Sequence, residues 1–252
     1  MNEESSKLLG SLLLFTQYFF EKRTGREFII TRPPSRVPHA IQICRALTKV
    51  FYGETKRLLI NIEPRSGKTE LLISFICWCL AHYPDCNFIY TSYSATLSTK
   101  QTETVRQLLM LLEFGKLFPW TKLDPSSMAK DDFKTTENGT VFAVGAGGSI
   151  TGRGAGIKGV KERFGGAILI DDILKPDEAM SDSVRESRID WFSNTLISRR
   201  NNGDNTPIIF IGQRLHEDDL AGRILKGELD GYKWEELILP SIDNDNNILI
   251  PD

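Results

Sequence analysis

Short, continuous apolar runs alternate along the chain with longer segments of helical spacing. The apolar runs predict buried strands at 57–64, 87–93, 167–172 and 207–212. Helical spacing predicts helices over 7–21, 39–52, 69–83 and 96–113. The segment 69–83 is apolar nearly all round, which is typical of a helix buried against a sheet. We therefore expect a three-layer α/β fold: a mainly parallel central sheet with helices on both faces.

Two local signals refine this pattern. Two alternating runs flank Asn138-Gly139, a strong hairpin signal. Ser183 and Glu186 have capping-box spacing ahead of a helix that runs through Trp191. No internal repeat or low-complexity linker is visible, so we expect a helical lead-in over 1–56 and one core over 57–240.

Composition and charge exclude several classes of protein. The 252 residues include 31 Lys and Arg against 33 Asp and Glu, and 40% are hydrophobic. This is ordinary globular composition, and a net charge of −2 excludes a histone-like basic protein. The apolar stretch 8–20 is too short to span a bilayer, and the acidic start is the wrong sign for a secretory signal. We expect a soluble chain that does not bind membranes.

The four cysteines show no zinc-binding spacing and are expected to be reduced core residues. They are Cys44, Cys77, Cys79 and Cys86.

The most informative segment joins the first strand to the all-apolar helix. Gly67-Lys68-Thr69 there matches the second half of a Walker A loop, although Ile62 stands where the first glycine usually falls. Gly67 allows backbone N–H groups to approach phosphate, Lys68 supplies a charge to the β- and γ-phosphates, and Thr69 offers a hydroxyl to Mg²⁺. The alternative is an ordinary turn. Because the correct elements flank the motif, we predict a nucleotide site.

A second acidic signal supports this prediction. The strand 167–170 is followed by Asp171 and Asp172. Asp171 is expected to hold Mg²⁺ through water, and Asp172 to orient or deprotonate the attacking water. Most P-loop ATPases of the additional-strand class have Glu at the position of Asp172. Glu178 therefore remains an alternative residue to activate the water. The structural alternative is a solvated turn after a buried strand.

A glycine-rich segment lies just before the acidic strand. The run 154–159 fits G-x-G-x-x-G, but it does not follow a strand and open a helix, so we reject a dinucleotide-binding reading. Six of the twelve residues in 145–156 are Gly, which predicts a flexible loop. Arg153 lies near its middle, where a mobile charge could sense a nucleotide or a neighbouring subunit.

Taken together, the motifs resemble the ATPase domain of the large terminase subunit of tailed bacteriophages and prophages. The resemblance covers nearly the whole chain and is most specific in the last of five segments. These are 60–69, 90–94, 151–154, 169–175 and 212–220. It implies a RecA-like P-loop NTPase of the additional-strand class. There the fourth strand inserts between the strands that carry the Walker A and Walker B motifs.

The resemblance also implies a function and partners. The family hydrolyses ATP with Mg²⁺ to pump double-stranded DNA into a procapsid, as a homo-oligomeric ring on the portal protein. A small terminase subunit selects the DNA. We expect this chain to be monomeric in isolation and to act in the host cell cytoplasm.

Individual roles follow where positions match the family's motifs. Gln42 is the candidate for the adenine edge, and Gln213 is the coupling residue near the γ-phosphate. Arg153 is expected to act in trans as an arginine finger, and Arg65 within its own site. The nucleotide-binding segment consists of Glu63, Pro64, Arg65, Ser66, Gly67, Lys68, Thr69 and Glu70.

The chain departs from the family at its end, because large terminases continue into a nuclease domain. The run 241–252 resembles the start of the linker to that domain, and Asp243 and Asp245 are expected to lie in a polar turn. We therefore expect a fragment, or the product of a degraded prophage gene, without nuclease activity.

Two other functions stay open. One is a helicase-like ATPase stimulated by DNA, and the other is an assembly module that binds ATP with little turnover.

Three basic clusters could contact DNA phosphates or form ordinary solvated faces. They lie within 22–36, 158–163 and 185–200.

Overall fold

A computed structural model describes residues 2–30, 36–229 and 231–242, and it is built around one eight-stranded mixed sheet. The strand order is β3-β4-β5-β2-β6-β7-β1-β8. The strands are β1 (Arg57–Ile62), β2 (Asn87–Ser92), β3 (Leu123–Met128), β4 (Asp132–Thr135), β5 (Thr140–Gly145), β6 (Ile168–Asp171), β7 (Ile208–Gly212) and β8 (Glu235–Leu239).

Six neighbouring strands, from β5 to β8, pair in parallel, and β4 and β3 extend one edge in antiparallel fashion. β7 lies between β6 and β1, with Asp171 opposite Ile211 and Asn61 opposite Gly212. The carboxyl ends of these three strands therefore meet at one edge of the sheet. This arrangement confirms the predicted fold class and the inserted fourth strand.

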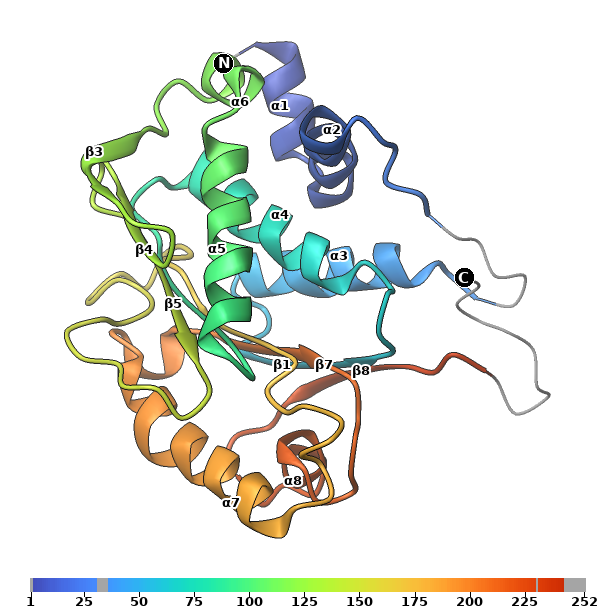
Figure 1. The fold of residues 1–252 in the computed structure, drawn as a ribbon. Coiled ribbons are helices and arrows are strands. Elements are labelled where there is room, and N and C mark those ends of the chain that lie inside the picture. Colours follow the sequence, from blue (N-terminus) through green and yellow to red (C-terminus); the bar gives the residue numbers. More distant parts are fainter. Residues whose placement is uncertain (1, 31–35, 230, 243–252) are drawn as a thin grey trace.

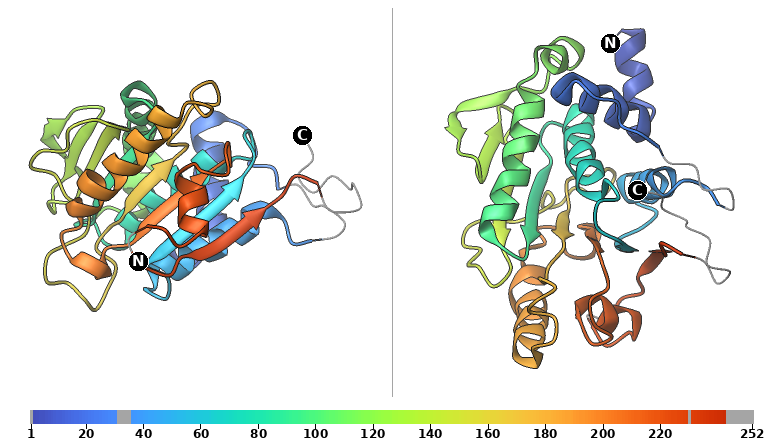
Figure 2. Two further views of the ribbon diagram at one scale, coloured as in Figure 1. Left: turned by 90° about the horizontal axis from the view of Figure 1, so that it is seen from below. Right: turned by 45° about the vertical axis from the view of Figure 1, so that its right-hand side comes forward.

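Helices cover both faces of the sheet (Figures 1 and 2). The first six pack on one face, whereas α7 and α8 pack on the other. The helices are α1 (Glu3–Leu9), α2 (Leu12–Thr24), α3 (His39–Phe51), α4 (Lys68–His82), α5 (Ala95–Leu109), α6 (Leu112–Leu117), α7 (Asp182–Trp191) and α8 (Leu220–Leu225). A short π-helix (Phe192–Leu196) and a 3₁₀-helix (Ile197–Arg199) extend α7. A second 3₁₀-helix spans Gly203–Asn205.

Each central strand contributes alternate residues to two separate cores. On β7, Ile209 and Ile211 belong to the core under α4, whereas Ile208 and Phe210 belong to the core under α7 and α8. Burial on both faces explains why these strands are continuous apolar runs. The first core also includes a cluster of fully buried aromatic rings from α2 and α6. This cluster consists of Phe15, Phe19, Phe114 and Phe118.

Most predicted elements are confirmed within a few residues, but two predictions are wrong. The single helix expected over 7–21 is two helices, because the chain turns at Gly10 and the Ser11 side chain caps α2 by accepting from the Leu14 N–H at 3.3 Å. The capping box is also wrong, because α7 begins at Asp182 and its N-cap residue is Ser181. The hairpin about Asn138-Gly139 is confirmed as β4 and β5, and Asn138 adopts φ 65°.

Further predictions concern the cysteines, membrane-spanning helices, the G-x-G-x-x-G segment and the aspartates near the end of the chain. The four cysteines are free and buried, as expected. No helix within the described ranges is long and apolar enough to cross a membrane. The segment 154–159 does not link a strand to a helix, consistent with rejecting the dinucleotide motif. Asp243 and Asp245 lie outside the described residues.

The glycine-rich loop is held to its surroundings at several points. Arg188 donates to the Ala146 carbonyl at 3.1 Å, and the Trp191 indole donates to the Gly148 carbonyl at 2.8 Å. Gly154 packs so closely on Asn201 that a Cβ there would overlap its side chain. Glycine at position 154 therefore allows close packing against Asn201. The prediction of a flexible loop did not include this role.

Candidate functional site

The turn between β1 and α4 has the backbone of an anion-binding loop. Gly67 precedes the first residue of α4 and adopts φ 77°, a left-handed conformation that favours glycine. Arg65 also has a positive φ of 62°, and the Ser66 hydroxyl donates to the Glu63 carbonyl at 3.0 Å. The first N–H groups of α4 have no partners within the helix, so this turn presents donors to an anion.

The N-terminal helices hold this loop at several points. The buried His39 ring of α3 contacts the Ser66 carbonyl, with Nε2 to O at 2.8 Å. Arg23 of α2 pairs with Glu70 in the first turn of α4 at 2.5 Å. A Cβ added at Gly67 would lie 3.4 Å from the Phe28 ring. The sequence did not predict these contacts, because no motif links residues so distant along the chain.

Asp171 lies at the end of β6 and faces the start of α4. One of its carboxylate oxygens, Oδ2, accepts from the Thr69 hydroxyl at 2.8 Å and from the Tyr90 hydroxyl at 2.6 Å. Burial, with the adjacent Asp172 charge, raises the pKa of Asp171 to about 6. The two hydrogen bonds and the nearby Lys68 act in the opposite direction, but burial is the larger effect.

These residues fit a bound Mg²⁺. Asp171 is 2% exposed, and its second oxygen, Oδ1, has no hydrogen-bond partner within the described part of the chain. Carboxylate and hydroxyl oxygens are ligands that Mg²⁺ prefers, and Mg²⁺ at nucleotide sites uses few protein ligands, with phosphates and waters completing the shell. The described residues include no group of three or more His, Cys, Asp or Glu that could hold a metal ion.

Asp172, the next residue, reaches both the phosphate-loop lysine and the end of β7. Its Oδ2 lies 3.0 Å from the Lys68 ammonium, whose side chain is 5% exposed. Its Oδ1 accepts from the Gln213 backbone N–H at 3.3 Å. Asp172 adopts φ 48°, a left-handed conformation that Asp and Asn tolerate better than most residues. One carboxylate thus links the loop after β1 to the chain leaving β7.

The structure does not bring every predicted residue to this point. Gln42 donates to the Val37 carbonyl at 2.7 Å, so its amide is turned back toward the start of α3. Arg65 is exposed. Glu178 lies 3.8 Å from each of Lys175 and Arg188 and forms weak ion pairs with both.

Arg153 lies at the other end of the sheet. It forms an ion pair with Asp132 on β4, with Nε 3.0 Å from Oδ1. β4 is five strand positions from β1, roughly 24 Å at the usual strand spacing. Arg153 is therefore remote from the phosphate loop of its own chain.

The segment after β7, which carries the most family-specific motif, forms a compact polar turn. Asp219 is buried and caps α8: its carboxylate accepts from the N–H groups of Leu215, His216 and Gly222 at 2.8–3.1 Å. The Asp218 N–H donates to Nδ1 of His216 at 3.0 Å. This turn fixes the path of the chain directly after Gln213.

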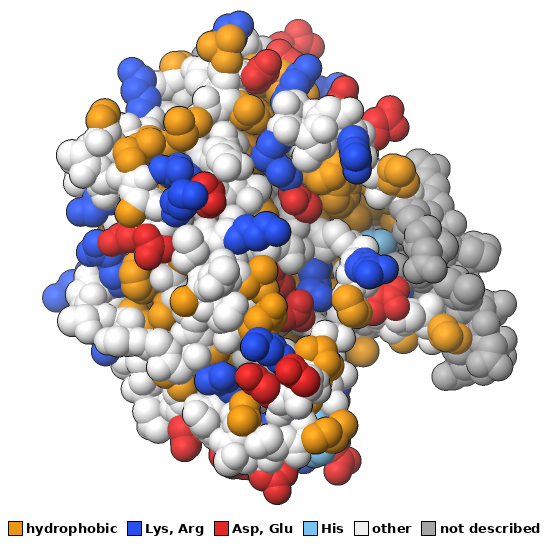
Figure 3. Space-filling model, in the orientation of Figure 1, with side chains coloured by type: hydrophobic (Ala, Val, Ile, Leu, Met, Phe, Trp, Pro, Cys, Tyr) orange, Lys and Arg blue, Asp and Glu red, His pale blue; other side chains and the backbone are white. Residues whose placement is uncertain are grey.

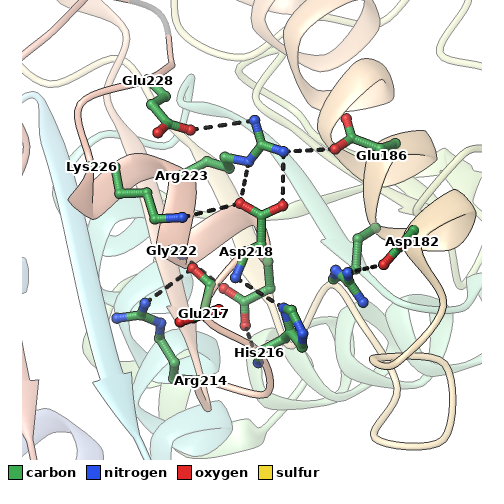
Figure 4. A network of polar contacts seen from close by, with 12 residues as sticks. Asp182, Glu186, Arg214, His216, Glu217, Asp218, Gly222, Arg223, Lys226 and Glu228 are labelled. Atoms are coloured by element: carbon green, nitrogen blue, oxygen red, sulfur yellow. Dashed lines mark hydrogen bonds and ion pairs between the residues drawn. The ribbon is translucent and has the colours of Figure 1, made fainter.

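An ion-pair network joins this turn to α7 (Figure 4). Arg223 of α8 lies 2.7 Å from Asp218, 2.7 Å from Glu186 of α7 and 3.3 Å from Glu228. The turn that follows Gln213 is thereby connected to α7 on the same face of the sheet.

Basic side chains form no single large patch on the face drawn in Figure 3, where they are interleaved with acidic ones. Several of the predicted cluster members are paired. Arg163 pairs with Asp85, Arg185 with Asp182, and Arg200 with Asp204. These contacts do not identify a DNA-binding surface.

Comparison with solved structures shows that this fold is similar to that of a bacteriophage large terminase. The large terminase of bacteriophage HK97 matches 94% of this chain with a TM-score of 0.54 and 14% identity, over 44% of its own length. The large terminase of a thermophilic bacteriophage, in complex with ATP-γ-S, matches 81% of the chain (TM-score 0.42, 12% identity, 45% of its length). Yeast Dbp5 bound to Nup159, Gle1, IP6 and ADP matches 93% (TM-score 0.45, 15% identity, 52% of its length).

The HK97 match confirms the RecA-like α/β fold and the predicted resemblance to large terminases at the level of the fold. The chain spans less than half the length of the two terminases. No protein-family model matches the chain, and no curated protein sequence matches it.

Proposed function

We propose that this chain is the ATP-hydrolysing motor domain of a viral DNA-packaging terminase. The observation that carries the proposal is the meeting of three strand ends around Lys68. Thr69 lies in the first turn of the helix after β1. Asp171 ends β6 and Asp172 follows it, and Gln213 follows β7. A phosphate-binding loop beside two carboxylates with different surroundings is what phosphoryl transfer to water requires.

Each side chain then has a distinct role in hydrolysis. Lys68 and the N–H groups that begin α4 bind the phosphates of ATP. Asp172, once Lys68 has moved to the phosphates, orients the attacking water and accepts its proton. Gln213 is coupled to Asp172 through its backbone N–H, so a change at the γ-phosphate reaches the turn before α8.

Thr69 and Asp171 would hold Mg²⁺, which supplies charge neutralisation at the β- and γ-phosphates when bound. Asp171 must be ionised for this task. Tyr90 fixes the orientation of its carboxylate through the hydrogen bond to Oδ2.

As partners we propose double-stranded DNA, the portal protein and a small terminase subunit, with assembly into a homo-oligomeric ring. Arg153 is the candidate finger across the ring interface, because it is far from the phosphate loop of its own chain. Acting in trans requires Arg153 to leave Asp132 on assembly. The Asp132 pair thus provides a resting position for the arginine in the isolated chain.

The first test is ATP hydrolysis with Mg²⁺ across a range of protein concentrations. We expect specific activity to rise with concentration and to vanish in Lys68→Ala. Arg153→Ala should reduce turnover by about 10³-fold or more without weakening ATP binding. Lys130→Ala, an exposed lysine paired with Glu103, is the matched control. Binding and turnover that are unchanged in Lys68→Ala would refute the proposal.

The second test separates packaging from unwinding. Duplex DNA should stimulate hydrolysis in a salt-dependent manner, because a motor that moves any sequence holds the phosphate backbone. Strand separation by the same protein would favour the helicase-like ATPase instead. Tight ATP binding without turnover at any concentration, with or without DNA, would favour the assembly module.

A further inference from the structure

A buried histidine touches the phosphate loop from outside the motifs that define it. His39 is the first residue of α3 and is 5% exposed. Its Nε2 lies 2.8 Å from the Ser66 carbonyl oxygen, 27 residues later in the chain. A carbonyl oxygen only accepts hydrogen bonds, so Nε2 carries the hydrogen.

The other ring nitrogen fixes the protonation state. Nδ1 is buried and has no hydrogen-bond partner among the described residues. The charged groups that act on the ring are Arg36, which disfavours a second proton, and Glu63, which favours one. Burial is the largest effect and lowers the pKa of His39. The ring is therefore neutral near pH 7 and donates from Nε2 only.

The geometry of a peptide unit gives this contact a consequence for phosphate binding. The Ser66 carbonyl and the Gly67 N–H belong to one planar trans unit and point in opposite directions. Fixing the carbonyl toward α3 turns the Gly67 N–H away from α3. The left-handed φ of Gly67 then leads directly into the first turn of α4.

We infer that His39 is a positioning residue that holds the phosphate loop ready for a nucleotide, by anchoring the Ser66 carbonyl and thereby aiming the Gly67 N–H. This inference rests on the proposed ATP site. A loop ordered before binding spares the ligand the entropic cost of ordering it, so His39 acts on nucleotide affinity. His39 touches no reacting atom, so the rate of the chemical step at saturation depends on it little.

A second histidine offers a matched control. His82, at the end of α4, is partly buried, and burial lowers its pKa as it does that of His39. Its Nε2 contacts the Leu9 carbonyl at 3.1 Å. That carbonyl lies at the end of α1 and not in the phosphate loop. A purely structural histidine is expected to behave as His82 does.

The experiment uses the full chain, with a fluorescent ATP analogue and Mg²⁺ for affinity, steady-state hydrolysis, and thermal unfolding. His39→Leu should weaken binding by about 5- to 30-fold, the usual effect of one lost hydrogen bond and a less ordered loop, with kcat changed less than about threefold. His39→Gln, whose amide reaches the position of Nε2, should restore most of the affinity. His39→Asn, one methylene shorter, should not. His82→Leu should lower the melting temperature without changing affinity.

The outcomes separate this inference from the proposed function. If Lys68→Ala abolishes binding and His39→Leu does not weaken it, the inference is wrong and the ATP site stands. Should His39→Leu fail to fold, the Gln and Asn variants decide: equal affinities in both contradict the inference. If Lys68→Ala binds the analogue as well as the unaltered chain, the ATP site is wrong and the inference falls with it.

Discussion

The ion pair between Lys68 and Asp172 has a consequence for nucleotide affinity. The two groups lie 3.0 Å apart, yet in the proposed ATP site each is needed elsewhere once ATP is bound. Phosphates must therefore compete with Asp172 for the lysine. We predict that Asp172→Asn binds ATP more tightly than the unaltered chain, although it hydrolyses ATP poorly.

The substitution is well suited to isolate the charge. Asn tolerates the left-handed φ of 48° at this position, and its amide oxygen can still accept from the Gln213 N–H. The substitution removes only the negative charge. The attraction of that charge for Lys68 and its repulsion of phosphate are then both lost. Both changes favour the bound state.

The magnitude follows from distance and burial. At 3.0 Å and an effective dielectric constant of about 20, the gross attraction is roughly 5 kcal/mol. Desolvation offsets much of this, and the Asp172 side chain remains 23% exposed, so the net value is about 1–3 kcal/mol. Removing this competition tightens binding by roughly 5- to 100-fold. Loss of the water-orienting carboxylate lowers kcat by about 10²- to 10⁴-fold.

The assay is calorimetric titration with Mg²⁺ and a slowly hydrolysed ATP analogue, beside steady-state turnover. Asp177→Asn removes the same charge from an exposed residue five positions later and should change neither quantity. An Asp172→Asn variant whose affinity is unchanged or weaker would show that the pair does not compete with the nucleotide.

Two further predictions concern the stability of the free protein. Asp171 has a pKa raised to about 6, so its favourable contribution is present below the unfolded value near 4 and is lost as the pH rises through 6. Asp171→Asn should therefore stabilise the protein at pH 8 by about 1–3 kcal/mol and much less at pH 4, while removing Mg²⁺-dependent binding; equal shifts in melting temperature at pH 4 and pH 8 would contradict this. Gly166 adopts φ 117°, and a Cβ there would overlap the Asn87 carbonyl, so Gly166→Ala should cost about 2–4 kcal/mol in urea unfolding. Gly115→Ala, with open space around it and a helical backbone, is the control and should cost nothing.

The layers of the fold, and the edge of the sheet where the site lies, could be predicted from the hydrophobic pattern alone. Strands such as β6 and β7 are buried on both faces, so their apolar runs are visible without knowledge of their neighbours. Asp171 ends β6, Gln213 directly follows β7, and Lys68 begins the helix that follows β1. In a parallel sheet all carboxyl ends lie at one edge, so local order along the chain was sufficient to predict that these residues lie near one another. The roles assigned to them stay predictions.

The position of the inserted strand came from the resemblance to large terminases and not from periodicity. Hydrophobic spacing reports which residues are buried, but it is the same for any order of the strands. The edge strands β3 and β8 were missed because they are only partly buried and therefore carry no continuous apolar run. The helices α6 and α8 were missed because six residues are fewer than two helical turns, too few to show a period.

The pairing of polar groups depends on contacts between distant segments, which become visible only in the folded chain. The contacts of His39 with Ser66, Tyr90 with Asp171 and Arg153 with Asp132 join segments 21 to 81 residues apart. A buried polar side chain must find a partner, but the sequence does not specify which one, because the choice depends on strand order and helix packing. The same packing holds Lys68 against Asp172 and places Arg153 beside β4, three strands from β6 and five from β1. The tertiary structure therefore determines which charges reach the phosphate loop.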